Sequence, residues 1–301
     1  MNSGFLTLFC TFWKSQRFRE GGERMMDEVR YHMLRPNQVV ERRHQCPVAY
    51  IPIGTLEWHG VHLPLGADTL QAEGIAVQCA KQGGGLVFPP LYYGENRLEG
   101  LMESNASDRE QIAQHMEVSP ENFTAQRHPY SAAEQALNYH KLLLHILAEA
   151  ESLGFELGVL VAGHYPLIDH ARAAVLQFNQ RDAAGRSAML AWAFVDYLLV
   201  QDRYPLAGDH AACWETSHVL ALHPETVAMD ALAAEGADHV GVGGRVPPEE
   251  ATASYGEEIL AAAVDVAVQE VRHRLAHPSL YRQHGQSLLE RQYKEVGGDE
   301  R

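Results

Sequence analysis

Residues 51–68 read IPIGTLEWHGVHLPLGAD, and the rest of the chain is organised around this stretch. It completes an apolar segment, residues 48–53, that stops abruptly at Gly54. The glycines and prolines that follow are typical of a loop, so the pattern predicts a strand that runs directly into a loop. Open α/β sheets bind their ligands at this carboxyl end of a strand, so we look there for function.

The predicted loop carries three side chains that are able to bind a metal ion. Glu57, His59 and Asp68 lie within twelve residues of one another in the sequence. Carboxylate and imidazole groups are ligands suited to zinc or manganese. A polar surface loop with solvated acids and an incidental His59 would have the same composition, and this stretch alone leaves both interpretations open.

The composition of the whole chain indicates a globular, cytoplasmic protein. Of its 301 residues, 46% are hydrophobic, which suffices for a large core. The formal net charge of −15 argues against nucleic acid or an anionic membrane as a main partner. No apolar run approaches the roughly eighteen residues of a membrane span. The four cysteines are scattered without a CxxC pair, which fits a reducing compartment and gives no disulfide framework.

The two ends of the chain differ from the middle. Residues 4–13 are apolar, but their basic neighbours follow instead of preceding them, so the segment does not have the order of a signal peptide. We expect a poorly ordered extension over residues 1–25, one domain over 26–280 and a polar tail over 281–301. Within the domain, residues 95–128 are polar and predict an irregular excursion near the site.

Strands and helices alternate beyond the opening stretch. The apolar patterns predict further strands over residues 86–93, 156–162 and 189–199, and helices over 69–82, 131–153, 167–179, 215–222 and 256–275. The helix over 131–153 has a capping box at its start, Ser131 with Glu134, and we expect its apolar face to contain Leu137, Leu142, Leu143, Ile146 and Leu147. Such alternation predicts an α/β fold with a mostly parallel sheet.

Three motifs resemble the signatures of the creatininase (creatinine amidohydrolase) family. Residues 54–68 match its pattern G-[ST]-x-E-x-H-G-x-H-L-P-x-x-x-D, including the spacing. Gly163, His164 and Tyr165 follow a predicted strand, as the second signature requires, and residues 209–217, DHAACWETS, resemble the third. A weaker similarity covers residues 251–260. Because the matches follow the family's order from about residue 35 to 275, the chain is identified as a member of this family.

The chain departs from the family pattern at five places, one of which is residues 129–131, PYS, where the family has Pro-Gly-Thr. Ala162 stands where the family has Asn, Pro166 where creatininase has a metal-binding Glu, and Ala212 where the family has Gly. The spacer between Asp209 and His210 is one residue shorter than in the family. By itself, His164 would be interpreted as a histidine that caps the end of a strand.

The resemblance implies a three-layer α/β/α sandwich, creatininase-like, that holds two divalent metal ions per chain. Asp68 would bridge the ions, with Glu57 and His164 on one ion and His59 on the other. Proline has no ligand atom, so we expect Glu215 to supply the carboxylate missing at position 166. The expected ions are Zn²⁺ or Mn²⁺, with Fe²⁺ as a third option.

By the same resemblance, the protein is a hydrolase of carbon–nitrogen bonds other than peptide bonds. A metal-activated hydroxide would attack a small amide, either a creatinine-like cyclic amide or a formamide, with His210 and Glu215 as catalytic residues and Tyr165 against the substrate. The alternative is a non-catalytic or regulatory relative whose second metal site has decayed, as the departures at Ala162, Pro166 and Ala212 would allow. Family members are commonly hexamers, so we expect a homo-oligomer.

Overall fold

The computed structural model describes residues 28–94, 106–124, 127, 129–181, 189–235 and 239–281. The predictions for the N-terminal extension, for residues 95–105 of the excursion and for nearly all of the tail fall outside these ranges. None of the helices in the described ranges combines the length and the apolar character that a membrane span requires.

A four-stranded parallel sheet forms the centre of the described structure. Its strands are β1 (Val48–Ile53), β2 (Leu86–Val87), β3 (Leu157–Ala162) and β4 (Leu190–Val195), in the spatial order β2-β1-β3-β4. Val48 lies opposite Leu157, which in turn lies opposite Leu190. Every residue of β1 and β3 is buried, as expected for the inner strands of a parallel sheet that is covered on both faces.

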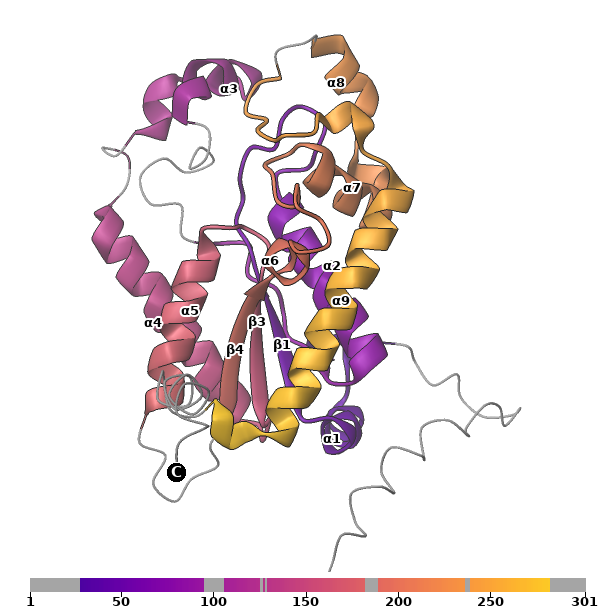
Figure 1. Ribbon diagram of the computed structural model, residues 1–301. Coiled ribbons are helices and arrows are strands. Elements are labelled where there is room, and N and C mark those ends of the chain that lie inside the picture. The colour runs from indigo at the N-terminus through magenta and orange to yellow at the C-terminus, as the bar shows by residue number, and fades with distance from the viewer. Residues whose placement is uncertain are drawn as a thin grey trace, which may run out of the picture.

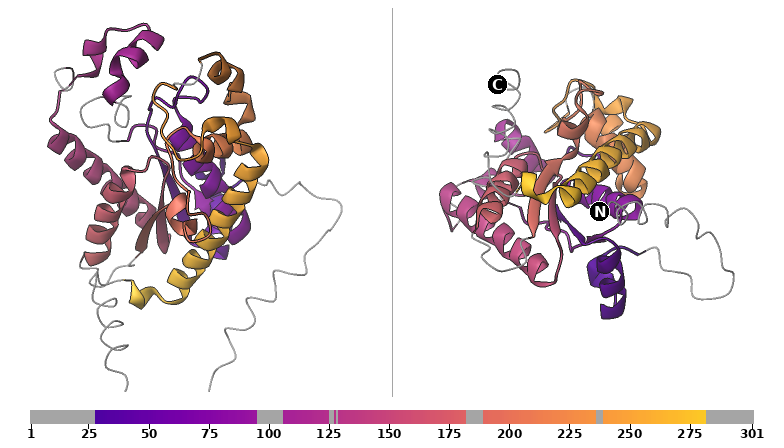
Figure 2. Two further views of the ribbon diagram at one scale, coloured as in Figure 1. Left: turned by 45° about the horizontal axis from the view of Figure 1, so that its top comes forward. Right: turned by 60° about the horizontal axis from the view of Figure 1, so that its bottom comes forward.

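Helices cover both faces of this sheet, which confirms the three-layer α/β/α fold (Figures 1 and 2). One face is covered by α4 (Ala132–Ser152) and α5 (Leu167–Gln180), and the other by α2 (Ala67–Gly83) and α9 (Ala253–Ala276). Alternate strand residues enter the two cores, so that Ile51 packs on the α4 and α5 side and Tyr50 on the α2 and α9 side.

Shorter helices complete the described structure. The remaining α-helices are α1 (Pro36–Gln45), α3 (Arg109–His115), α6 (Asp196–Val200), α7 (Cys213–Leu222) and α8 (Met229–Glu235). The 3₁₀ helices are η2 (Tyr31–Met33), η4 (Ala106–Asp108), η5 (Pro120–Phe123), η7 (Pro224–Thr226), η8 (Pro248–Glu250) and η9 (Pro278–Leu280). The helices η4, α3 and η5 lie within the segment 95–128, which we expected to be irregular. Helix α3 stands above the carboxyl ends of the strands in Figure 1.

Two predicted strands are shorter in the structure than their apolar patterns suggest. The strand expected over 86–93 ends as β2 at Val87, because Pro89 and Pro90 have no N–H group to donate to a neighbouring strand. The strand expected over 189–199 ends at Val195, and α6 begins at Asp196. An acidic residue in the first turn favours a helix start, which outweighs the apolar character of the residues that follow.

Helix α4 forms at the predicted place, but its buried face differs from the prediction. The capping box is present, since the Ser131 and Glu134 side chains each accept the other residue's backbone N–H. Leu137 and Leu142 are 51% and 38% exposed, so their assignment to the apolar face was wrong. The buried residues of α4 recur every three or four positions on a face centred on Leu143, and neither exposed leucine lies on that face.

Helices α7 and α9 approach each other closely on the second face of the sheet. A Cβ atom on Gly256 of α9 would lie only 1.9 Å from the carbonyl oxygen of Ser217 in α7. Glycine is therefore required at this crossing, and α9 fixes the position of α7.

Candidate metal centre

The topology places two loops next to each other at the carboxyl ends of β1 and β3. Strand β1 leads into the loop 54–66 and then into α2, whereas β3 leads into residues 163–166 and then into α5. Since α2 and α5 cover opposite faces of the sheet, the two segments diverge beyond the strand ends, the arrangement at which open α/β sheets bind their ligands. The first turn of α2 touches the second loop, because a Cβ atom on Gly163 would lie 1.8 Å from the carbonyl oxygen of Asp68.

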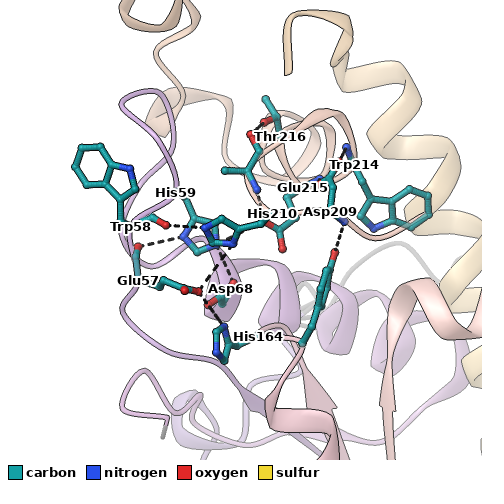
Figure 3. Close-up of polar contacts among 12 residues, drawn as sticks. Glu57, Trp58, His59, Asp68, His164, Asp209, His210, Trp214, Glu215 and Thr216 are labelled. Atoms are coloured by element: carbon teal, nitrogen blue, oxygen red, sulfur yellow. Dashed lines mark hydrogen bonds and ion pairs between the residues drawn. The ribbon is translucent and has the colours of Figure 1, made fainter. Parts of the chain in front are cut away.

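Five buried side chains converge at these strand ends and make up two of the three overlapping sets of described residues that could hold a metal ion (Figure 3). In the first set, the Nδ1 atom of His164 lies 3.0 Å from Glu57 Oε2 and 3.2 Å from Asp68 Oδ2. In the second set, the Nε2 atom of His59 lies 3.0 Å from Asp68 Oδ1 and 3.5 Å from Glu215 Oε2. Asp68 therefore presents one carboxylate oxygen to each set.

These atoms have the spacing of ligands around metal ions. Two ligands that bind a zinc ion tetrahedrally at about 2.0–2.1 Å are themselves about 3.3–3.5 Å apart, and somewhat closer at smaller ligand angles. The ring orientation of His59 agrees with this role. Its Nδ1 lies 3.1 Å from the carbonyl oxygen of Glu57, so Nδ1 donates there, and Nε2 is the nitrogen that faces the two carboxylates and would bind an ion. Donor atoms that converge in this way fit a divalent cation.

The electrostatics of the centre also favour a cation. All five side chains belong to residues that are at most 2% exposed. Burial alone would lower the pKa of His59, but Asp68, Glu215 and Glu57 raise that pKa to about 10. Burial would raise the pKa of Asp68, yet His59 and His164 hold it well below its usual range. Burial raises the pKa of Glu215 well above its usual value, because His59 offsets only part of the effect. Divalent ions between these groups would relieve the crowding of negative charge.

His210 forms the third set, with Glu57 and His59, but its ring is oriented differently from that of His59. Its Nδ1 atom is 4.0 Å from Glu57 Oε2, and its ring centroid is 4.5 Å from that of His59. Its Nε2 atom lies 2.9 Å from the carbonyl oxygen of Trp58. A carbonyl only accepts, so Nε2 donates and Nδ1 carries the lone pair. Burial lowers the pKa of His210 to about 4, so this ring is neutral near pH 7.

Glu215 is held by the residues that begin α7. The carboxylate of Asp209 accepts the backbone N–H groups of Trp214, at 2.6 Å, and of Glu215, at 3.1 Å. Glu215 Oε2 accepts the N–H of Ala211, at 2.7 Å. Ala211 has a φ of 56°, in the left-handed region that disfavours residues with a Cβ atom, so this turn is strained.

The structure brings Tyr165 to the same turn. The Asp209 backbone N–H donates to the Tyr165 hydroxyl at 3.4 Å, and the Tyr165 ring lies 4.7 Å from that of Tyr197. Burial raises the pKa of Tyr165 well above 10, so its hydroxyl keeps its proton. Pro166 precedes α5 and contributes no ligand atom. Contact between Tyr165 and a substrate stays a prediction.

The sequence did not assign roles to several residues that support the centre. His62 Nε2 lies 2.9 Å from Thr216 Oγ1, which ties the metal loop to α7. The indole N–H of Trp214 donates to Asp196 Oδ2 at 2.9 Å. Asp209 could have been found from sequence, since an acid shortly before a helix commonly caps it. The His62 and Asp196 contacts join distant segments, and no local pattern signals them.

Comparison with known proteins gives consistent matches. The family model for creatininase, described as creatinine amidohydrolase, matches residues 32–271. The chain is 25% identical over 195 residues to a creatinine amidohydrolase of Pseudomonas putida, covering 61% of this chain and 67% of that protein. It is 36% identical over 66 residues to a 3-dehydro-scyllo-inosose hydrolase of Thermotoga maritima, covering 22% of this chain and only 21% of that relative.

The fold has a counterpart among solved structures. A mutant creatininase of the Zn-Zn type superimposes with a TM-score of 0.59 and 20% sequence identity, over 82% of this chain and 98% of that one. At 20% sequence identity, this similarity supports a shared fold and nothing more specific.

Proposed function

Because the chain belongs to the creatininase family, we propose that it is a metal-dependent amidohydrolase that cleaves a carbon–nitrogen bond in a small amide. The observation that carries the proposal is the orientation of Asp68, whose two oxygens face two separate ligand sets. This arrangement supports two divalent ions per chain. Nitrogen and oxygen donors favour Zn²⁺ or Mn²⁺, with Fe²⁺ as a further option.

Each side chain has a proposed role in this reaction. Glu57, Asp68 and His164 would hold one ion, and His59, Asp68 and Glu215 the other. Metal pairs of this kind polarise a carbonyl group and lower the pKa of a bound water towards neutrality.

The remaining roles fall to residues beside the ligands. His210 would accept a proton on Nδ1 and pass it to the nitrogen of the leaving group, which its neutral state permits. Tyr165 would contact the substrate, since its protonated hydroxyl lies at the Asp209 turn that precedes Glu215. Glu215 would replace the carboxylate that position 166 does not provide.

The substrate is proposed at the level of a class. Creatinine-like cyclic amides and formamides are the first compounds to test, on the basis of family membership. A second candidate is 3-dehydro-scyllo-inosose, because the 66-residue match is to a hydrolase of that compound. We further propose that residues 26–280 form the catalytic domain and that the protein is a cytoplasmic homo-oligomer, a hexamer as is common in the family, which mass measurement in solution would test.

The test combines metal analysis with an activity screen. Purified protein should contain about two divalent ions per chain and should hydrolyse at least one compound of the screen. Glu215→Gln should abolish turnover and release about one ion, since the amide keeps the size of the side chain but loses its charge. Protein that binds fewer than two ions even after exposure to excess Zn²⁺ or Mn²⁺ would refute the two-metal proposal and favour the non-catalytic alternative.

A further inference from the structure

Trp58 stands between two proposed metal ligands, and its side chain leaves the centre. Figure 3 shows its indole turned away from the group formed by Glu57, His59 and Asp68. The residue is only 5% exposed. It packs against Ile112 of α3 and Phe123 of η5, and these contacts form a small apolar cluster apart from the main core. The loop that carries the ligands is thus anchored to the polar excursion.

The same indole donates a hydrogen bond to a third segment, residues 240–243. This segment also pairs with the backbone of His210. The Trp58 indole N–H donates to the carbonyl oxygen of Val240 at 2.9 Å. One residue later, the Gly241 N–H donates to Asp108 Oδ2 at 2.9 Å. Gly243 then pairs with His210 through two backbone hydrogen bonds of 2.7 and 2.8 Å. The excursion, residues 240–243 and the backbone of His210 therefore form one connected unit.

The backbone of Trp58 also forms a hydrogen bond with the ring of His210. Its carbonyl oxygen accepts the Nε2–H at 2.9 Å, which selects one of the two neutral forms of the ring. In that form the lone pair belongs to Nδ1, the atom nearest Glu57. A carbonyl oxygen displaced by even about 1 Å would lose this hydrogen bond, because such bonds weaken steeply beyond their normal length.

We propose that Trp58 is a positioning residue that couples the segment 106–123 to His210 and keeps His210 in the Nε2–H form. The excursion then supports the proton-transferring group and is not merely a surface insertion. This inference rests on the proposed function for its catalytic consequence. The assignment of the ring form does not depend on any activity.

The experiment records the ¹⁵N signals of the His210 ring in zinc-loaded protein, assigned by their absence in His210→Gln. The unsubstituted protein should show a single form with the proton on Nε2. Trp58→Phe keeps an aromatic ring but removes the N–H that holds Val240, so both neutral forms should be present. Trp192→Phe on β4 is the matched control, because it makes the same chemical change far from the site, and it should leave the single form unchanged.

Kinetics provide a second readout once a substrate is known. Trp58→Phe should lower kcat roughly tenfold or more with KM and metal content unchanged, since a misdirected general base loses part of its usual 10²–10⁴-fold contribution. A single Nε2–H form in Trp58→Phe, or equal disturbance in Trp192→Phe, would overturn the proposal. If Trp58→Phe does not fold, Asp108→Ala releases the same unit at Gly241, and an unchanged ring form there would overturn it as well. An inactive protein with the expected ring forms would contradict only the proposed function.

Discussion

At the scale of single residues, Asp68 has the greatest influence on the centre. It lies in the first turn of α2, where the helix dipole favours an anion, and each of its oxygens faces a different histidine. Loss of a ligand that contacts one ion usually weakens the binding of that ion. Loss of a shared ligand weakens the binding of both ions.

We therefore expect Asp68→Asn to lose both ions. The amide keeps the shape of the side chain but removes the charge that the two cations share. Asp202→Asn, which changes an exposed carboxylate outside the centre, should retain the metal content of the unsubstituted protein. Elemental analysis after dialysis measures both variants, and two retained ions in Asp68→Asn would exclude a bridging role.

A second residue-scale prediction concerns His62 and pH. Burial lowers the pKa of His62 to about 4, while an unfolded histidine titrates near 6.5. Between these values the unfolded chain binds a proton that the native chain does not, so stability is present above pH 6.5 and is lost as the pH falls towards 4.

His62→Gln should flatten this dependence, because the glutamine amide can still reach Thr216 but does not titrate. The slopes of unfolding free energy against pH should differ by up to about 1.4 kcal/mol per pH unit. Urea unfolding with a chelator present, so that metal binding does not contribute, makes the comparison. Parallel curves for the two proteins would show that His62 is not the group responsible.

At the scale of elements, two helix starts are capped by side chains but have different consequences. Ser131 caps α4, which lies on the outer layer, whereas Asp209 accepts N–H groups at the start of α7, which carries Glu215. Removing a cap costs about 1 kcal/mol in either helix. Only the second cap lies next to a proposed ligand.

Ser131→Ala should therefore lower the melting temperature with two ions retained. Asp209→Ala should lower it by a comparable amount and also weaken the ion bound through Glu215. Thermal unfolding together with metal titration distinguishes the two effects. Equal metal affinity in both variants would mean that the turn before α7 has no part in placing Glu215.

The elements also show what sequence could and could not predict. The strand before Gly54 was predictable, and so were the candidate ligands Glu57, His59 and Asp68, because they are close in the chain and their pattern is local. The end of β4 at Val195 and the exposure of Leu137 were not predicted, since apolar character alone does not say which neighbour covers a side chain. The contact between Trp58 and His210 joins residues 152 positions apart and has no local signal.

At the scale of the whole molecule, helix crossings on one side of the sheet determine where α7 lies. Gly74 of α2 approaches the flexible end of the Leu222 side chain, whereas Gly256 of α9 approaches the backbone of Ser217. A side chain can move aside, but a helix backbone cannot move without displacing the residues that it carries.

Gly256→Ala should accordingly destabilise the fold by about 1–3 kcal/mol or more and reduce the affinity for one of the two ions. Gly74→Ala makes the same substitution at the other crossing, where better helix propensity opposes the clash, and should be much milder. Denaturant unfolding and metal titration measure both variants. Similar losses in the two would show that α9 does not fix α7.

The close packing of α9 on α7 also has a consequence for biosynthesis. Glu57, Asp68 and His164 precede α7 in the chain, whereas α9, which packs on α7, follows it, so we expect Glu215 to reach its final position only after α9 has been translated and has docked. The two ions should therefore be acquired one after the other by the nascent chain. Chains stalled just before α9 is translated should hold one divalent ion and released chains two, and two ions on stalled chains would contradict this order.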